Sequence, residues 1–351
     1  MDGQELIYYL GSKTPKGNTW YFMVEGRDEI FEVWTNVGNN MLGDLIALRE
    51  LETLPVINYE TLNRVLVERA DDAIEIVPLG AEGNGVSLAT FKMISPYAVD
   101  VNTEKFTALV ETLSALTIGG YVDTTDDLAQ YGLETPQAAL TLADADGGAL
   151  TVYIGDQRSY SDYFMRVGDD MNKVFYVSAT LANAVLNQSA FALADSFIGL
   201  VNIANVTEMT IETTGRTDKV VITREKQLNA DGTEKVLSNG EPDYLETFAY
   251  NGSVVDTKLF KEAYTALIGI TIDGELPRKG AQAEGLSNEL LLRATYTLST
   301  LDEPFIVEYY PYKNVYCGAR AGAVSTLSEP LFFVQKTRVE NAVRLLTGLV
   351  P

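Results

Sequence analysis

Val101-Asn-Thr-Glu-Lys-Phe106 returns 154 residues later as Val255-Asp-Thr-Lys-Leu-Phe260, a displacement that carries position 101 to 255 and 106 to 260. The match continues downstream, because Gly132-Leu133 recurs as Gly285-Leu286 at nearly the same displacement. Self-similarity at one spacing is the signature of a duplicated supersecondary unit. The sequence therefore predicts that one unit was copied along the chain.

We place the two full copies at residues 57–200, called unit A, and at residues 201–351, called unit B. Residues 1–56 look like a third, partial copy, because Tyr9-Leu-Gly11 matches Tyr153-Ile-Gly155. This copy begins in mid-unit. We interpret it as the back half of a truncated unit.

The partial copy also aligns Tyr21-Phe-Met23 with Tyr163-Phe-Met165, and Phe31-Glu-Val33 with Phe175-Tyr-Val177. These runs predict strands. We expect them to pack onto the neighbouring unit as one complete sheet, because an unpaired strand edge promotes aggregation.

Within a unit, short β-branched and aromatic runs alternate with turn residues. Leu150-Thr-Val-Tyr-Ile154 is one such run, and Asp144-Ala-Asp-Gly-Gly148 before it has hairpin spacing. Phe260, Tyr264 and Leu267 share one face of a helix that we expect Asp256 to cap. Strand runs with interspersed helices predict an α+β fold: tandem repeats of antiparallel β-meanders, about two and a half units.

The composition excludes several functions. The chain of 351 residues has 26 Lys and Arg against 49 Asp and Glu, a net charge of −23, and no His. This charge disfavours nucleic acid and anionic lipid as partners. The missing imidazole excludes histidine-dependent catalysis and histidine zinc sites. Cys317, the single cysteine, reads as a core residue. We therefore predict no catalytic residues, no cofactor and no metal.

Adjacent carboxylates are the remaining catalytic candidates. Asp71-Asp72, Asp126-Asp127 and Asp169-Asp170 could in principle act as a glycosidase acid and base. Each pair lies in a turn-like polar stretch, so we interpret all three as solvated turns or helix caps. Asp144 to Gly148 lacks the full ligand pattern of a calcium loop and reads as a hairpin turn, and Gly80 to Gly85 reads as a loop.

Tyrosine is abundant, with 19 copies, and several tyrosines cluster in corresponding hairpins. An aromatic platform at a hairpin tip would suit sugar stacking or a protein hot spot. The alternative, which we favour, is a cross-strand aromatic ladder on a sheet face. The candidate binding surface comprises Trp20, Tyr21, Tyr160, Tyr163, Tyr309, Tyr310, Tyr312 and Tyr316.

One stretch of unit A carries a family resemblance. Leu128-Ala-Gln-Tyr-Gly-Leu-Glu-Thr-Pro136, then Leu150-Thr-Val-Tyr-Ile-Gly-Asp156, then Val174-Phe-Tyr-Val177 resembles the domain-of-unknown-function family 4340. The resemblance covers roughly residues 88–223. It implies an N-terminal membrane anchor, a location on the extracytoplasmic face of a bacterial cytoplasmic membrane, and an association with gliding-motility-type ABC transporters. It implies no reaction, and no anchor is seen in this sequence.

Together these observations predict a non-catalytic extracytoplasmic recognition or scaffolding protein, an accessory component of an ABC-type transport system. Its expected partners are membrane transporter components, and it would meet the membrane only through an anchor absent from this chain. The first alternative is a protein that binds a glycan or small molecule with Tyr-rich hairpins. The second is a carboxylate-dependent hydrolase, which requires two acids from different segments to converge in a cleft, one with a raised pKa.

Overall fold

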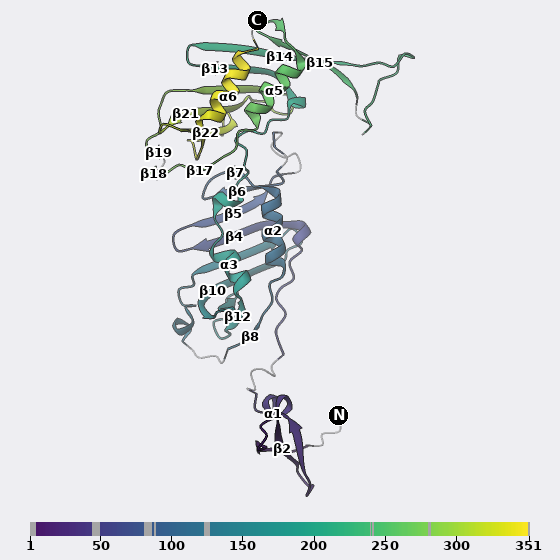
Figure 1. Cartoon of the computed structure of the whole chain (residues 1–351), viewed down its shortest axis with the longest axis vertical. Helices are drawn as coiled ribbons and strands as arrows, with labels where there is room; N and C mark the ends of the chain where they lie inside the picture. Colours follow the sequence, from purple (N-terminus) through teal and green to yellow (C-terminus); the bar gives the residue numbers. More distant parts are fainter. Residues whose placement is uncertain are drawn as a thin grey trace.

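The computed structural model describes residues 5–43, 50–80, 86–87, 89–122, 127–238, 240, 242–279 and 282–349. Along the long axis of the molecule, a small N-terminal sheet lies at one end, unit A lies in the middle and unit B lies at the other end (Figure 1). In the described ranges no helix is long and apolar enough to cross a membrane.

In its described part, unit A contains a nine-stranded sheet in the order β7-β6-β5-β4-β9-β10-β11-β12-β8. Neighbouring strands are antiparallel. The strands are β4 (Leu62–Arg69), β5 (Ala73–Pro78), β6 (Phe91–Ser95), β7 (Val99–Asp100), β8 (Gly120–Tyr121), β9 (Ala138–Asp144), β10 (Ala149–Ser159), β11 (Asp162–Val167) and β12 (Phe175–Ser178).

Over its own described residues, unit B repeats that sheet in the order β16-β15-β14-β13-β20-β21-β22-β23-β17. Each strand takes the place of its counterpart, so β13 corresponds to β4 and β20 to β9. The bounds are β13 (Val206–Thr213), β14 (Arg216–Lys226), β15 (Tyr244–Tyr250), β16 (Ser253–Val254), β17 (Gly274–Glu275), β20 (Leu292–Leu298), β21 (Phe305–Tyr312), β22 (Tyr316–Ala323) and β23 (Phe332–Gln335). The predicted α+β fold of tandem antiparallel repeats is confirmed.

Two helices cover one face of each sheet (Figure 1). They are α2 (Thr103–Ser114) and α3 (Ala179–Leu186) in unit A, and α5 (Thr257–Ile268) and α6 (Lys336–Thr347) in unit B. The repeated hexapeptide begins α2 and α5. Asn102 and Asp256 each accept a hydrogen bond from a backbone N–H in the first turn, and Phe106 and Phe260 are buried against the sheets. A short helix, α4 (Ala190–Leu193), also contributes Leu193 to the core of unit A.

The family-like phrases pack against each other on the opposite face of unit A. Leu128–Tyr131 forms a 3-10 turn that ends at Gly132, whose φ of 66° is left-handed. A Cβ on Gly155 would overlap the carbonyl oxygen of Tyr131. The turn therefore packs directly against the backbone of β10, which is possible because residue 155 has no side chain. The Tyr-Gly-Leu and Ile-Gly-Asp phrases therefore form one contact that covers part of the second face of the sheet, around β10 and β11.

The N-terminal copy forms its own three-stranded sheet. It comprises β1 (Tyr8–Lys13), β2 (Thr19–Val24) and β3 (Ile30–Trp34), followed by α1 (Thr35–Met41). This order matches β10, β11, β12 and α3, as the sequence alignment predicts. The expectation that these strands join the neighbouring sheet was wrong, because unit A already fills the corresponding positions with its own strands.

The register of β2 also differs from the sequence alignment by one residue. Phe22 pairs with Phe31, as Met165 pairs with Phe175 in unit A. Phe22, rather than Met23, therefore occupies the position of Met165. A slip of one residue exchanges the two faces of a strand, so Trp20 and Phe22 share one face and Tyr21 and Met23 the other.

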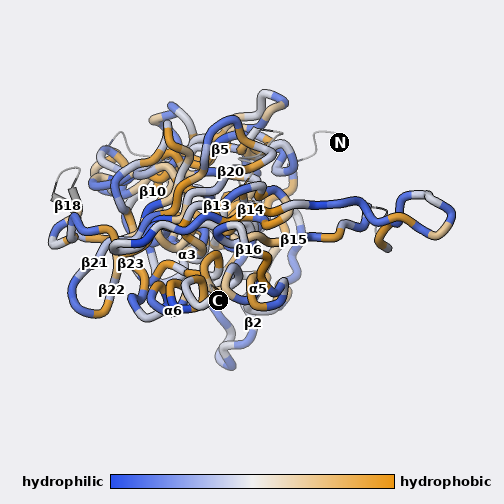
Figure 2. The backbone as a smooth tube through the Cα atoms, turned by 90° about the horizontal axis from the view of Figure 1, so that it is seen from above, coloured by the Kyte–Doolittle hydropathy of each residue, from blue (hydrophilic) through white to orange (hydrophobic). Residues whose placement is uncertain are grey.

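The turns match their predicted roles. Asp144 closes the β9–β10 hairpin by accepting hydrogen bonds from the backbone N–H groups of Asp146 and Gly148, at 2.9 and 2.7 Å. In unit B, the described residues between β14 and β15, namely 227–238, 240, 242 and 243, project beyond these strands as a largely hydrophilic arm (Figure 2). In the loop from Gly80 to Gly85, residues 81–85 lie outside the described residues.

Candidate functional site

The candidate aromatic residues do not gather on one surface. Trp20 and Tyr21 lie on β2, Tyr160 and Tyr163 at the β10–β11 hairpin, and the remaining four on β21 and β22. These are three separate sheets. Tyr160, at a hairpin tip, is 97% exposed and is the single fully accessible ring of the eight.

Two of the candidates belong to the core, which corrects their place on a binding surface. Tyr309 and Tyr312 are 1% and 2% exposed, because both point from β21 toward packed side chains. The ring centroids of Tyr312 on β21 and Tyr316 on β22 lie 5.9 and 4.8 Å from that of Phe333 on β23. Tyr312 and Tyr316 thus make cross-strand aromatic contacts of the kind that we favoured for the hairpin tyrosines.

The adjacent carboxylates occupy turns and caps. Both side-chain oxygens of Asp72 accept hydrogen bonds from Arg69, and Asp127 accepts from the N–H of Ala129 to cap the 3-10 turn. Asp170 accepts from the N–H of Asn172 in the turn after β11. Asp126 lies outside the described residues. None of the described members of these pairs lines a cavity that we find.

The principal hollow lies where the two units meet, and we call it the inter-repeat cleft. A cavity of about 270 Å³ lies between β7, the connector Asp195 to Leu200, and the β21–β22 end of unit B. A second cavity of about 830 Å³ adjoins it, because both are lined by Ala98, Val99, Asp100, Ala321, Thr326, Ser328 and Leu331.

Contacts between the units hold the cleft in place. The Tyr97 hydroxyl donates a hydrogen bond to Glu275 at 2.8 Å, and the Tyr97 ring meets Phe332 edge-on at 5.4 Å. On the connector, the N–H of Ile272 donates to the carbonyl of Ser196 at 2.8 Å. The walls of the cleft are thus tied by both backbone and side-chain contacts.

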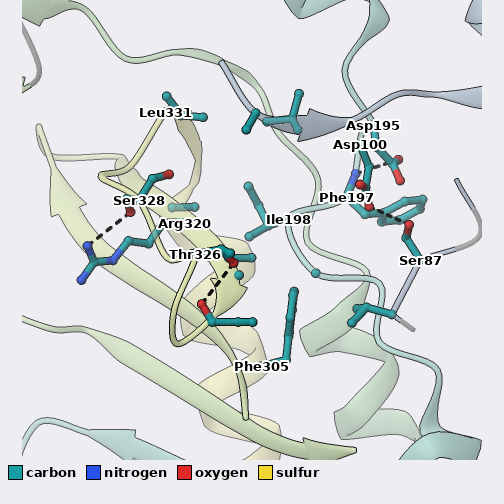
Figure 3. Close-up of a pocket in the computed structure, with 18 of the residues that line it drawn as sticks. Ser87, Asp100, Asp195, Phe197, Ile198, Phe305, Arg320, Thr326, Ser328 and Leu331 are labelled. Carbon is teal, nitrogen blue, oxygen red and sulfur yellow. Dashed lines mark hydrogen bonds between the residues drawn. The ribbon is translucent and has the colours of Figure 1, made fainter. Parts of the chain in front are cut away.

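Two aspartates from distant segments converge on one wall of the cleft (Figure 3). Ser87 donates a hydrogen bond to Asp100 at 2.6 Å, and the N–H of Asp195 donates to the carbonyl of Asp100 at 2.9 Å. Burial raises the pKa of Asp195, the N–H groups of Phe197 and Ser196 oppose that rise, and the charge of Asp100 adds to it. The pKa of Asp195 therefore lies above the ordinary carboxyl value.

The facing wall is apolar and hydroxyl-bearing. Ile198 and Phe305 project toward the hollow from the connector and from β21, with Thr326 nearby (Figure 3). Arg320 lines this wall, but its guanidinium points away from the aspartates, toward Ser328 (Figure 3). The Arg320 guanidinium also forms an ion pair with Glu308. The cleft thus combines carboxylates, hydroxyls and apolar side chains, with Lys92 lining the adjoining cavity next to Asp100 on the neighbouring strand. It suits a ligand with a cationic or hydroxyl group beside an apolar one.

Sequence reasoning missed this pair. Asp100 follows Val99 in unit A and belongs to none of the motifs that the sequence displays. The corresponding position of unit B holds Val254, which is 72% exposed. Asp195 lies in the connector, where no repeat pattern applies. The difference between the copies at position 100 was the one available signal, because a site made by two units need not be duplicated in each.

Asp195→Asn is expected to make the protein more stable than the wild type at neutral pH, and equally stable at low pH. The folded state holds the Asp195 proton more tightly than the unfolded state. The stability gained from that proton is therefore complete below the ordinary Asp pKa of 3.8 and is lost as the pH rises through the raised pKa of the folded state. Asparagine carries no charge and keeps an oxygen for the Phe197 N–H. We expect the variant to melt about 2 to 4 °C higher at neutral pH and like the wild type at low pH.

Asp169→Asn is the matched control for that experiment, because it removes the same charge from an exposed turn. Thermal unfolding of all three proteins across the acidic and neutral range makes the comparison. Melting temperatures of wild type and Asp195→Asn that run parallel at all pH values would contradict the assignment.

Comparison with known proteins gives one match. The family model described as Domain of unknown function (DUF4340) matches residues 2–127 and again residues 122–289. No curated protein and no solved structure matches the chain. Each matched segment runs from the back half of one repeat into the front half of the next, so the family pattern is out of phase with the two sheets by half a repeat.

Proposed function

Because the chain belongs to the DUF4340 family, we propose that it is a non-catalytic recognition or scaffolding protein on the extracytoplasmic face of a bacterial cytoplasmic membrane. In this role it is an accessory component of an ABC-type transport system. The expected partners are membrane transporter components.

The observation that carries this proposal is the inter-repeat cleft. Its lining comes from both units and from their connector, so the two copies together make a concave surface that neither makes alone. Duplicated modules commonly present extended concave surfaces of this kind to a protein partner. Two other charged residues of the cleft have partners within the protein: Glu275 accepts a hydrogen bond from Tyr97, and Arg320 forms an ion pair with Glu308.

The chemistry of the cleft favours a particular partner segment. Asp100 and Asp195 offer negative charge, and Ile198 and Phe305 offer apolar contact. A partner loop with a basic side chain next to an apolar one matches both, and the net charge of −23 would steer a basic partner toward the protein.

The expected result is that the wild-type protein recovers transporter components from membranes of its source bacterium, while Asp100→Asn/Asp195→Asn recovers at least tenfold less. The double variant removes two charges from the cleft. Asp169→Asn/Asp170→Asn removes two charges from an exposed turn and should behave as the wild type. Quantitative mass spectrometry of the recovered proteins provides the measurement. Equal recovery by the two double variants, or no transporter component above background with the wild type, would exclude the proposal.

A small-molecule or glycan ligand is the second candidate, favoured by the rings in the cleft. Phe197, 37% exposed, and Tyr97 line the two cavities beside Asp100. Rings with neighbouring carboxylates are a common arrangement for sugar recognition. A glycan that raises the melting temperature of the wild type, and does not do so for Asp100→Asn/Asp195→Asn, would support this candidate.

The hydrolase alternative rests on the same two acids. It requires Asp195 to act as a general acid, for which a raised pKa is suited, and Asp100 to act as its charged partner. Asp195→Asn separates this role from recognition. Loss of a hydrolytic activity with ligand binding retained would favour the enzyme.

A further inference from the structure

The N-terminal sheet exposes side chains whose counterparts form the core of unit A. Strand pairing fixes the correspondence, because Leu10 pairs with Phe22 as Ile154 pairs with Met165. By the same register, Tyr8 corresponds to Val152 and Leu6 to Leu150. Each residue of the N-terminal sheet can therefore be compared with the residue at the same structural position in unit A.

At these positions the exposures differ sharply. Leu6 and Tyr8 are 65% and 47% exposed, whereas Leu150 and Val152 are 4% and 0% exposed. The same holds for Phe31, which is 38% exposed against 2% for Phe175. On the helix, Val37 and Met41 are 43% and 40% exposed, and their counterparts Leu181 and Val185 are 3% and 1% exposed.

The front half of unit A covers these counterparts. On one side of β10, Leu140 of β9 pairs with Val152. The helix α2 packs with α3 in the same core, to which it contributes Phe106, Leu109 and Leu113. In the N-terminal sheet, β1 pairs with β2 on one side, and within the described residues no strand pairs with its other edge. In the part of the chain that the structure describes, the N-terminal sheet thus has no counterpart of β9 beside β1 and no counterpart of α2 beside α1.

On the opposite face of this sheet, none of the described residues forms an element that matches the Tyr131–Leu133 turn of unit A. Gly11 corresponds to Gly155, the residue that lets the Tyr131–Leu133 turn of unit A approach β10. The three atoms that a Cβ on Gly11 would approach most closely all belong to Tyr21, within the sheet itself, and the nearest lies at 3.2 Å. Tyr9 and Tyr21, on this face, are 46% and 38% exposed.

We propose that residues 5–43 form a docking face for a front half of the same repeat, that is, a segment with the fold of residues 57–148. This segment would add a strand antiparallel to β1, seat a helix like α2 beside α1, and place a Tyr-Gly-Leu turn over Gly11. One occupant thereby accounts for the open edge and for both exposed faces. Strand addition of this kind supplies backbone hydrogen bonds, and the apolar positions give its register.

A second copy of this chain is a poorer occupant. In the described ranges, units A and B each use their own front half within a complete sheet. A second chain therefore has no front half to offer without unfolding one of its units.

The test joins a duplicate of residues 57–148 directly to Glu5 of the full chain. In unit A, residue 148 precedes Ala149, the position that corresponds to Glu5, so the graft enters in register. Hydrogen exchange at the β1 amides is expected to slow at least tenfold. In the matched control, the graft alone carries Leu140→Asp and Leu142→Asp, and exchange should remain as in the ungrafted chain.

A cross-link checks the register independently. Tyr8→Cys with Leu140→Cys in the graft should oxidise to a disulfide, because the corresponding Val152 and Leu140 are paired in unit A. Tyr9→Cys with the same graft cysteine should not, since its side chain points to the other face. The proposal is overturned if the graft stays unfolded, or folds without protecting β1. It is also overturned if the ungrafted chain dimerises with β1 protected, which would identify a second copy as the occupant.

Discussion

Glu308→Ala is expected to lower the free energy of unfolding of unit B by about 1.5 to 3 kcal/mol, because it removes the buried acceptor that Arg293, Arg320 and Tyr310 share. Glu308 is 1% exposed and forms ion pairs with Arg293 and Arg320, and it accepts a hydrogen bond from Tyr310 at 2.8 Å. Burial raises the pKa of Glu308, but these three partners outweigh it, so the net shift is downward. Urea unfolding, followed by hydrogen exchange of the β21 amides, measures the loss.

The same network predicts a sign for the pH dependence. A carboxyl with a lowered pKa in the folded state contributes stability that is present above its unfolded pKa, ordinarily 4.5, and is lost as the pH falls through the folded value. Glu308→Ala should therefore lose its disadvantage in acid. The control is Glu308→Met with Arg293→Met and Arg320→Met, which removes all three charges and should recover most of the stability. An alanine variant as stable as the wild type at neutral pH would refute this account.

Gly155→Ala is expected to destabilise unit A by about 1 to 3 kcal/mol, the range of an overpacked core. The added methyl would overlap the carbonyl oxygen of Tyr131, a backbone atom that can move only with the whole Tyr-Gly-Leu turn. Leu133, behind that turn, is 1% exposed, so the turn has little room to retreat. Chemical denaturation of the full chain, monitored at the β10 amides, should show an earlier transition for unit A.

Gly80→Ala is the control, because a Cβ there meets nothing within 4 Å and its φ is ordinary. It should be neutral or stabilising by about 0.4 to 1 kcal/mol through the unfolded chain. If both glycine variants unfold like the wild type, the close approach of the two phrases does not contribute to the stability of the unit.

Much of the fold follows from patterns that act over short distances. The repeated hexapeptide begins a capped helix in each unit, with Phe106 and Phe260 at equivalent buried positions. Asp144 closes the hairpin where its spacing predicts a turn. These features depend on neighbours within one or two turns of chain, which the sequence displays directly.

Other features depend on which distant segment covers a surface. Side chains alternate along β21, so Glu308 lies on the face of the sheet opposite the face of Tyr309. From the sequence alone we would expect Glu308 to be exposed, unless another segment covers that face. In unit A the equivalent residue is Tyr153, with the guanidinium of Arg166 over its ring at 3.8 Å, and Arg166 corresponds to Arg320. One arginine position thus serves a cation–π contact in one copy and a buried ion pair in the other. The β2 register shows the same limit, because sequence similarity favoured a neighbouring alignment and the pairing with β3 decided otherwise.

The amino-acid sequence by itself determined that one unit recurs, that each copy is an α+β meander, and where its helices begin and its hairpins turn. The tertiary structure alone decided that Asp100 and Asp195 meet in a cleft, that Tyr309 and Tyr312 are core residues, and that residues 5–43 stand apart as a separate sheet. The reason is physical. Periodicity records which side of an element is apolar, whereas the partner of that side is selected by the packing of segments far away in the chain.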